Sequence, residues 1–341
     1  GDSDKFKIGT TAIGTGTILA LDTNSIMSMS NNDSGGTGGG DSTSGNTLFG
    51  YLAGEDIADG GSNNSLIGHG AGKNITTGVN NTIIGSEAGD GFDAENNNVI
   101  IGQGAGSGAI AGADACVIIG KDAVAGAATQ DGTVAVGKDA LKALTSGLGN
   151  IAIGYQALDA EDDGDYNTAI GYQALTAQTG ATGAVRNTAV GYQAGLALTD
   201  GLNNTAIGGL ALSTDDGGSG STAVGVSALK SQNVGDETSG NTAVGHNAGF
   251  YNVTGTNNTY LGSEAGTGVS TKSHSGCVFI GRNAGLTAYT GANNIAIGFG
   301  AMDDIDVDAT VGASTENIFI GKDSGGGTWS TNDSNYNVGI G

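Results

Sequence analysis

The chain of 341 residues contains 67 glycines and no proline, and glycine at this level without a Gly-X-Y period excludes a collagen-like triple helix. Its 34 acidic and 11 basic residues give a formal net charge of −23, which disfavours binding to nucleic acid and to anionic membrane surfaces. No run of 18 apolar residues is present, so we expect no transmembrane helix and no membrane insertion. No signal peptide precedes Gly1, so we expect a processed chain or a segment of a longer one.

Residues 1–45 differ from the rest of the chain. They contain a partial repeat at 11–14 (Thr-Ala-Ile-Gly), an apolar run at 18–21 (Ile-Leu-Ala-Leu) and a glycine-rich tract at 35–40. Repeat proteins need terminal caps, and the apolar runs are strand-like. This segment is therefore expected to be an N-terminal cap or adaptor.

Residues 46–341 consist of tandem copies of one motif, with no linker and no second domain. The clearest copies, NTAIGYQAL at 167–175 and NTAVGYQAG at 187–195, align on the glycine that ends the apolar triplet. Most steps between these glycines are 17 residues, and longer steps of 18 to 23 carry insertions. About sixteen complete copies and a truncated seventeenth predict an all-β, parallel β-solenoid, or β-roll. The aligned glycines are Gly50, Gly68, Gly85, Gly102, Gly120, Gly137, Gly154, Gly171, Gly191, Gly208, Gly225, Gly245, Gly262, Gly281, Gly298, Gly321 and Gly341.

The polar and small positions of the repeat predict its hydrogen bonds and its corners. Asparagine stands four residues before the glycine in 13 of 17 copies, and stacked asparagines predict a ladder of amide-to-amide hydrogen bonds. The glycine itself predicts a sharp turn with positive φ. Alanine follows three residues later in 15 of 16 copies, which indicates close packing at the corner. The exceptions are Cys116, Thr133, Ser221 and Cys277 in the asparagine column and Ser324 in the alanine column.

The predicted strands contain two adjacent apolar columns, one and two positions before the repeat glycine. The residue immediately before the glycine is Ile, Val, Leu or Phe in every copy, and we expect this column to fill the interior. The column two before the glycine is also apolar, although alternation places it on the opposite strand face. We therefore expect that face to pack against another chain, the alternative being a monomer with an unusually long exposed apolar stripe. This second column contains Leu48, Leu66, Ile83, Ile100 and Ile118, then alanines from Ala135 to Ala243, then Tyr260, Phe279, Ala296, Phe319 and, in the truncated copy, Gly339.

Acidic loops are the candidate metal sites. Asp304, Asp306 and Asp308 alternate like the start of a calcium loop, but Ala309 and Thr315 stand where an EF-hand has glycine and glutamate. An EF-hand is excluded, and weak calcium binding by acidic loops stays open beside a purely solvated role. No other cofactor is expected.

The remaining chemical patterns predict no catalytic site. His69 and His246 occupy a variable position after the glycine and are expected to be surface residues; the third histidine is His274. The Gly-x-Gly patterns at 68–73 and 102–106 arise from the repeat and lack the setting of nucleotide-binding loops. Paired carboxylates in the loops could hydrolyse glycans, but such pairs arise by chance in an acidic chain. We therefore expect no enzyme, and no catalytic, cofactor-binding or metal-binding residue is assigned.

The two cysteines are not expected to be bonded to each other. Cys116 and Cys277 both stand in the asparagine column, nine repeats apart. At ~4.8 Å per turn they would lie about 40 Å apart, whereas a disulfide needs Cα atoms within about 7 Å.

One aromatic column stands out. Tyr155, Tyr172 and Tyr192 share the position after the glycine and are expected to stack. Such a row can stabilise the solenoid or bind sugar rings, and both interpretations stay open.

The motif N-T-A-[IV]-G-x-x-A resembles the head repeat of trimeric autotransporter adhesins and the glycine-rich repeats of phage tail fibres. The matching positions are Asn150, Ala152, Ile153, Gly154 and Ala157, with their equivalents over residues 46–341. The resemblance implies a left-handed β-roll in which three chains pack side by side. The 17-residue repeat is longer than the adhesin head unit, which favours the fibre repeats.

The expected function is an extracellular structural fibre, either the shaft of a virion tail fibre or a cell-surface appendage, with the chain itself as the main partner. The alternatives are an adhesin that binds a cell-surface glycan or receptor and a self-polymerising filament. Residues 337–341 form half a repeat without a cap, so we expect the chain to continue or its end to dock on a neighbour.

Overall fold

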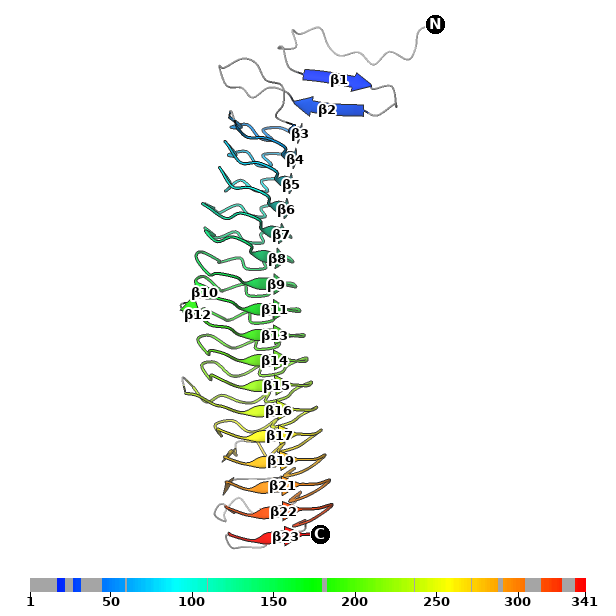
Figure 1. Cartoon of the computed structure of the whole chain (residues 1–341), viewed down its shortest axis with the longest axis vertical. Coiled ribbons are helices and arrows are strands. Elements are labelled where there is room, and N and C mark those ends of the chain that lie inside the picture. Colours follow the sequence, from blue (N-terminus) through cyan, green and yellow to red (C-terminus); the bar gives the residue numbers. More distant parts are fainter. Residues whose placement is uncertain are drawn as a thin grey trace.

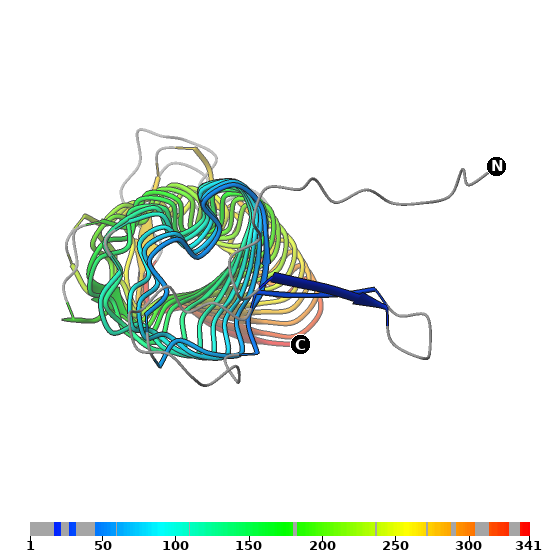
Figure 2. The same ribbon diagram turned by 90° about the horizontal axis from the view of Figure 1, so that it is seen from above.

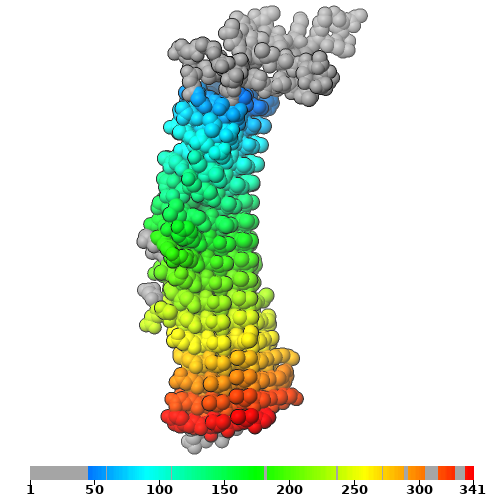
Figure 3. Space-filling model, in the orientation of Figure 1, coloured from blue at the N-terminus to red at the C-terminus, as the bar shows by residue number. Residues whose placement is uncertain are grey.

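The chain folds as a parallel β-solenoid of about sixteen turns. The computed structural model describes residues 17–21, 27–31, 45–58, 60–108, 110–179, 183–235, 237–270, 272–287, 291–303, 314–326 and 335–341. All regular elements in these ranges are β-strands, and the turns stack into a continuous rod (Figures 1 and 3). The predicted fold class and repeat length of about 17 residues are confirmed.

Seventeen strands of three residues form the main sheet, one strand per repeat. Each pairs in parallel with the strand of the next turn, with equivalent residues in register, as Thr168 does with Thr188. The sheet is open, because β3 and β23 lie at opposite ends of the stack (Figure 1). The strands are β3 (Thr47–Phe49), β4 (Ser65–Ile67), β5 (Thr82–Ile84), β6 (Val99–Ile101), β7 (Val117–Ile119), β8 (Val134–Val136), β9 (Ile151–Ile153), β11 (Thr168–Ile170), β13 (Thr188–Val190), β14 (Thr205–Ile207), β15 (Thr222–Val224), β16 (Thr242–Val244), β17 (Thr259–Leu261), β19 (Val278–Ile280), β21 (Ile295–Ile297), β22 (Ile318–Ile320) and β23 (Val338–Ile340).

Three smaller strand pairs accompany this sheet. β1 (Thr17–Leu21) and β2 (Met27–Asn31) form an antiparallel hairpin that lies beyond β3 and projects to one side of the tube (Figure 2). β1 includes the apolar run expected to be strand-like, while the segments 11–14 and 35–40 lie outside the described residues. The loops carry two short parallel pairs, β10 (Gly164–Asp165) with β12 (Gly183–Ala184) and β18 (His274–Ser275) with β20 (Gly291–Ala292).

The repeated glycine is required by both its backbone conformation and its close contacts. Gly171 has a φ of +139°, a region that is essentially restricted to glycine. A Cβ on Gly171 would lie 2.3 Å from the carbonyl oxygen of Gly191 in the next turn. The predicted positive φ is confirmed, and the contact explains why no other residue occupies this column in any turn.

The two faces of the strands are reversed relative to the sequence-based prediction. The residue two before the glycine points inward: Ala169 is fully buried, whereas Ile170, immediately before the glycine, is 37% exposed. The same alternation holds near both ends of the sheet, for Leu66 and Ile67 at one end and for Phe319 and Ile320 at the other. The prediction that the Ile and Val column fills the interior is therefore wrong, and the alanine column does not face another chain.

Alanine can line the interior because a second residue of the same turn fills the remaining space. In the turn of Ala152, the fully buried Leu158 stands four residues after the glycine. In the turn of Leu66, that position is Gly72, where a Cβ would lie 3.1 Å from Leu66 Cδ2. A large strand residue with glycine, or alanine with leucine or methionine, occurs in 13 of 16 turns. The total side-chain volume of each turn is thus kept nearly constant, as close packing requires.

The exceptions to this volume rule are compensated by neighbouring residues. Ala189 is paired with Gly195, and a Cβ on Gly195 would lie 3.1 Å from Leu198 Cδ1. Ala243 is paired with Gly249, where the ring of Tyr260 from the next turn fills the space. The third exception is Ile118 with Val124, an intermediate case.

The asparagine column bonds mainly to the backbone instead of forming the predicted amide-to-amide ladder. Asn64 Oδ1 accepts from the N–H of Asn81 in the next turn at 2.9 Å, and its Nδ2 donates to the Gly78 carbonyl at 2.8 Å. Most asparagines of the column tie a strand to the following turn and to their own loop in this way, whereas Asn98 Nδ2 has no hydrogen-bond partner among the described residues. Amide-to-amide bonds occur at a few steps, such as Asn258 Nδ2 to Asn241 Oδ1 at 3.0 Å.

The Asn-Asn doublets of the repeat have two separate roles. The first residue of each doublet has a positive φ, as Asn203 does at +57°, and asparagine tolerates that region better than most residues. The second, such as Asn204, is the buried ladder residue. Two further columns also have positive φ, two and four residues after the glycine, and include Gln173 (+53°) and Leu175 (+51°).

Candidate functional site

The outward face of the main sheet carries a long apolar strip. It consists of the residues one and three positions before each repeat glycine, and alternation directs both columns away from the interior. Neither column contains a charged residue. The column three positions before the glycine consists of Thr, Ser, Val and Ile. The column one position before the glycine consists of Phe49, Ile67, Ile84, Ile101, Ile119, Val136, Ile153, Ile170, Val190, Ile207, Val224, Val244, Leu261, Ile280, Ile297, Ile320 and Ile340.

This face is large enough to be an interface. Sixteen steps of ~4.8 Å and two columns ~7 Å apart give a strip of at least about 500 Å², near the upper end of the apolar patches found on monomers. Two such strips in contact would bury about 1,000 Å², the lower bound for a specific interface. The predicted apolar face therefore exists, although it is formed by the other column.

A second surface feature lies just beyond the corner glycine, where tyrosines stack along the rod. The ring centroids of Tyr155 and Tyr172 are 5.1 Å apart with planes at 18°, and those of Tyr172 and Tyr192 are 5.6 Å apart at 16°. The predicted stacked row is confirmed. At the N-terminal end of the row, Lys138 Nζ lies 5.2 Å from the centroid of the Tyr155 ring, a cation–π distance.

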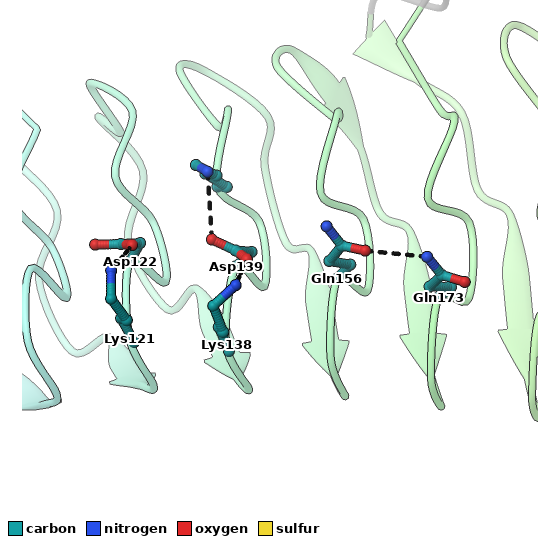
Figure 4. Close-up of polar contacts among 7 residues, drawn as sticks. Lys121, Asp122, Lys138, Asp139, Gln156 and Gln173 are labelled. Atoms are coloured by element: carbon teal, nitrogen blue, oxygen red, sulfur yellow. Dashed lines mark hydrogen bonds and ion pairs between the residues drawn. The ribbon is translucent and has the colours of Figure 1, made fainter.

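The next residue of each turn forms a parallel amide ladder. Gln173 Nε2 donates to Gln156 Oε1 at 3.0 Å, and Gln193 Nε2 donates to Gln173 Oε1 at 2.9 Å. In the preceding turn the column continues as Asp139, which pairs with Lys138 at 2.5 Å (Figure 4). Burial raises the pKa of Asp139, but hydrogen bonds from Lys138 and Lys142 outweigh burial and hold that pKa below its usual value. The column is thus charged at Asp122 and Asp139, each paired with the lysine before it, and neutral at Gln156, Gln173 and Gln193.

An acidic corner follows Leu158. The carboxylates of Glu161, Asp162 and Asp163 lie within 4.8 Å of one another. Glu161 is fully buried, its Oε1 accepts from the Gly164 N–H at 2.6 Å and its Oε2 accepts from Asn167 Nδ2 at 3.2 Å. Burial raises the pKa of Glu161 to about 7. These hydrogen bonds, one from its own turn and one from the next, explain how Glu161 is accommodated as a buried corner residue.

The same corner position carries polar residues in several later turns. It lies seven residues after the glycine, where Leu144 and Leu198 are buried in other turns. Asp215 is fully buried there and accepts from Gln232 Nε2 at 2.5 Å. Burial raises its pKa, while Gln232 Oε1 accepts from Asn241 Nδ2 at 2.8 Å. The interior thus contains a hydrogen-bonded polar strip that the repeat pattern did not reveal.

His274 differs from the other two histidines because it is buried. It is 2% exposed, and its ring lies edge-on to Tyr260 at 5.4 Å between centroids. Among the described residues neither ring nitrogen has a hydrogen-bond partner, and the Tyr260 hydroxyl has none either. Burial lowers the pKa of His274 to about 4. His69 and His246 are exposed as predicted.

Three further predictions concern the cysteines, the alternating aspartates and the glycine-rich segment 68–73. Cys116 and Cys277 are both free and buried, so they are not bonded to each other, as predicted. Asp304, Asp306 and Asp308 lie outside the described residues, so the calcium prediction for that loop stays a prediction. Lys73, at the end of the glycine-rich segment 68–73, lies 3.7 Å from the Glu55 carboxylate in a surface ion pair.

Neither family models nor curated proteins provide a relative on which a function could be based. No protein-family model matches the chain, and no curated protein is similar to it at a significant level. In the described part of the chain, no helix is long and apolar enough to cross a membrane.

Proposed function

We propose that this chain is the structural shaft of an extracellular fibre, without catalytic activity, and that chains assemble side by side through the outward face. The observation that carries the proposal is the composition of that face. It has no charged residue over seventeen strands, although the chain has a formal net charge of −23. Charged residues are depleted in the centre of protein interfaces, so the distribution is typical of a surface that a partner covers along the full length of the rod.

The proposed assembly is a homotrimer. Each chain has one such face, and a closed ring of three chains can direct all three faces towards a common axis. The resemblance of the motif to trimeric adhesin heads and phage tail fibres supports the same number. The acidic loops on the other sides of each chain would then face solvent and keep the assembly soluble.

Sedimentation velocity over a range of protein concentrations tests this proposal. We expect the wild-type protein to sediment at three times its mass of 33.0 kDa. Ile170→Lys should release monomers, because unpaired charges buried at the axis cost several kcal/mol per chain. Thr179→Lys is the matched control, since it adds the same charge to an exposed position of the same turn and should leave the trimer intact.

A third variant separates assembly from folding. Ala169 is fully buried inside its own chain, so Ala169→Lys should unfold the turn, which circular dichroism would detect, instead of releasing folded monomers. A wild-type protein that is monomeric at every concentration would refute the proposal. An Ile170→Lys variant that assembles as well as the Thr179→Lys variant would refute the assignment of the interface.

A further inference from the structure

The tyrosine row and the glutamine ladder both end at the same turn. One turn after Tyr192 and Gln193 the equivalent residues are Gly209 and Leu210. One face of the Tyr192 ring therefore has no ring beside it, and the residue is 54% exposed. The next side chain in this column is Val226, which lies two turns beyond Tyr192 and is 53% exposed.

The space above Gly209 is open and has the width of one ring. A Cβ on Gly209 would meet only one atom within 4 Å, the carbonyl oxygen of Tyr192 at 4.0 Å. Two turns of ~4.8 Å separate Tyr192 from Val226 by about 10 Å. The neighbouring rings of the row are spaced by 5.1 and 5.6 Å, so a single ring placed in this gap would be about 5 Å from each wall.

A hydrogen-bond acceptor lies at the same step of the rod. Gln173 and Gln193 each donate from Nε2 to Oε1 of the glutamine in the preceding turn. The Oε1 of the last one, Gln193, consequently faces the turn of Leu210, whose side chain has no donor. An open aromatic face and an unused amide oxygen thus coincide at one step of the rod.

We propose that Tyr192, Gln193, Gly209 and Val226 form a slot that binds one neutral hexopyranose ring. The axial C–H groups of the sugar contact the electron-rich face of Tyr192, Val226 covers the opposite face, and a sugar hydroxyl donates to Gln193 Oε1. This binding activity is additional to the proposed structural role.

The chemistry of the slot favours a neutral sugar over other ring-shaped ligands. Its residues are uncharged, and the chain's charge of −23 repels phosphate-bearing ligands such as nucleotides. A purely aromatic ring would leave the Gln193 oxygen without a partner, and an acceptor that loses water without a new donor weakens binding. A hexopyranose offers both a C–H face and several donors.

The opposite end of the tyrosine row provides an internal control. Tyr155 has the same ring and the same stacking neighbour, but Lys138 lies over its outer face at 5.2 Å. A ring ligand therefore has an open tyrosine face at Tyr192 and a covered one at Tyr155.

Saturation-transfer NMR tests the slot with the methyl α- and β-hexopyranosides of glucose, galactose and mannose, and with p-cresol as an aromatic probe. We expect transfer to at least one glycoside. Gly209→Tyr should weaken its binding at least about tenfold by filling the slot, and Tyr192→Ala should do the same by removing the stacking face. The Gly209→Tyr chain should fold, because the equivalent position already holds tyrosine in four turns and Gly209 has space for a side chain. Circular dichroism checks this.

Tyr155→Ala, the matched control, should bind the glycoside like the wild-type protein. Undiminished transfer in the folded Gly209→Tyr variant would overturn the slot. Transfer to p-cresol alone, or to none of the probes, would overturn the assignment of a hexopyranose.

Discussion

The volume rule of the interior predicts that two damaging substitutions in one turn rescue each other. Ala152→Leu adds a large side chain at a fully buried position, and overpacking of this kind costs about 1–3 kcal/mol. Leu158→Gly removes a fully buried leucine, a loss of about 2–5 kcal/mol. Part of that loss is offset because Leu158 has a φ of +50°, where a non-glycine residue costs about 1–2 kcal/mol.

The double variant Ala152→Leu/Leu158→Gly reproduces the arrangement of Leu66 and Gly72. We expect its stability to lie within about 1 kcal/mol of wild type, so the favourable coupling between the two sites should be about 2 kcal/mol or more. Urea unfolding followed by circular dichroism measures the global effect. Amide hydrogen exchange over residues 150–160 measures the local one, which matters because long repeat arrays can unfold in parts.

The mismatched double variant Ala152→Leu/Leu229→Gly is the control. Its two sites are four turns apart, roughly 20 Å, so their costs should simply add. If the matched pair is as unstable as the sum of its single variants, the volume rule is refuted, and the alanine–leucine pattern has another origin.

Three further predictions concern the corners and the buried ionisable groups. Gly171→Ala should destabilise the chain by at least about 2 kcal/mol in thermal unfolding, because both its φ of +139° and the carbonyl of the next turn exclude a Cβ. The pKa of Glu161 is about 7 in the fold against 4.5 in the unfolded chain, so its stabilising contribution is complete below pH 4.5 and is lost as the pH rises through 7, about 3 kcal/mol in all. Glu161→Gln should therefore raise the melting temperature more at pH 8 than at pH 5, and an equal shift at both would contradict this. The pKa of His274 is about 4 in the fold against 6.5 when unfolded, so its contribution is present above pH 6.5 and is lost as the pH falls through 4. His274→Phe should reduce acid unfolding in that range, and an unchanged acid limb of the pH–stability curve would exclude the buried imidazole as its cause.

The sequence was sufficient to predict the repeat, the strands and the corners because these features recur at fixed spacing. The repeat period predicts the parallel stack of strands, and the invariant glycine predicts the turn. The column shared by Tyr155 and Tyr172 predicts the stacked row of rings. These properties depend on one residue type at one position. They can therefore be predicted without knowing how distant parts of a turn meet.

The orientation of the strands could not be predicted from hydrophobicity, because both faces are apolar. Ile170 is larger and more hydrophobic than Ala169, yet Ala169 is inside. The signal was present four residues after the glycine, where leucine accompanies alanine and glycine accompanies Leu66 or Phe279. The orientation of the strand is evident only when these two columns are compared within each turn, since both residues together fill the buried volume.

The buried polar residues were missed for a related reason. Glu161 and Asp215 stand in the acidic segments between motifs, which are typical of loops. Their column holds leucine in other turns, but no single copy shows that it is interior. His274 lies in an insertion, outside the aligned part of the repeat. In both cases burial depends on how a loop closes against the turn above it, which the spacing of the motif does not determine.

The repeat has a constant side and a variable side, and this division makes the chain a natural display scaffold. The step from Gly298 to Gly321 is 23 residues long, yet Ile295 and Ile318 pair in the same register as strands separated by 17 residues. Extra residues are accommodated in the loops and leave the spacing of the sheet unchanged. Peptides grafted into successive loops would therefore be presented in a straight array at intervals of ~4.8 Å along the rod, with valency set by the number of turns.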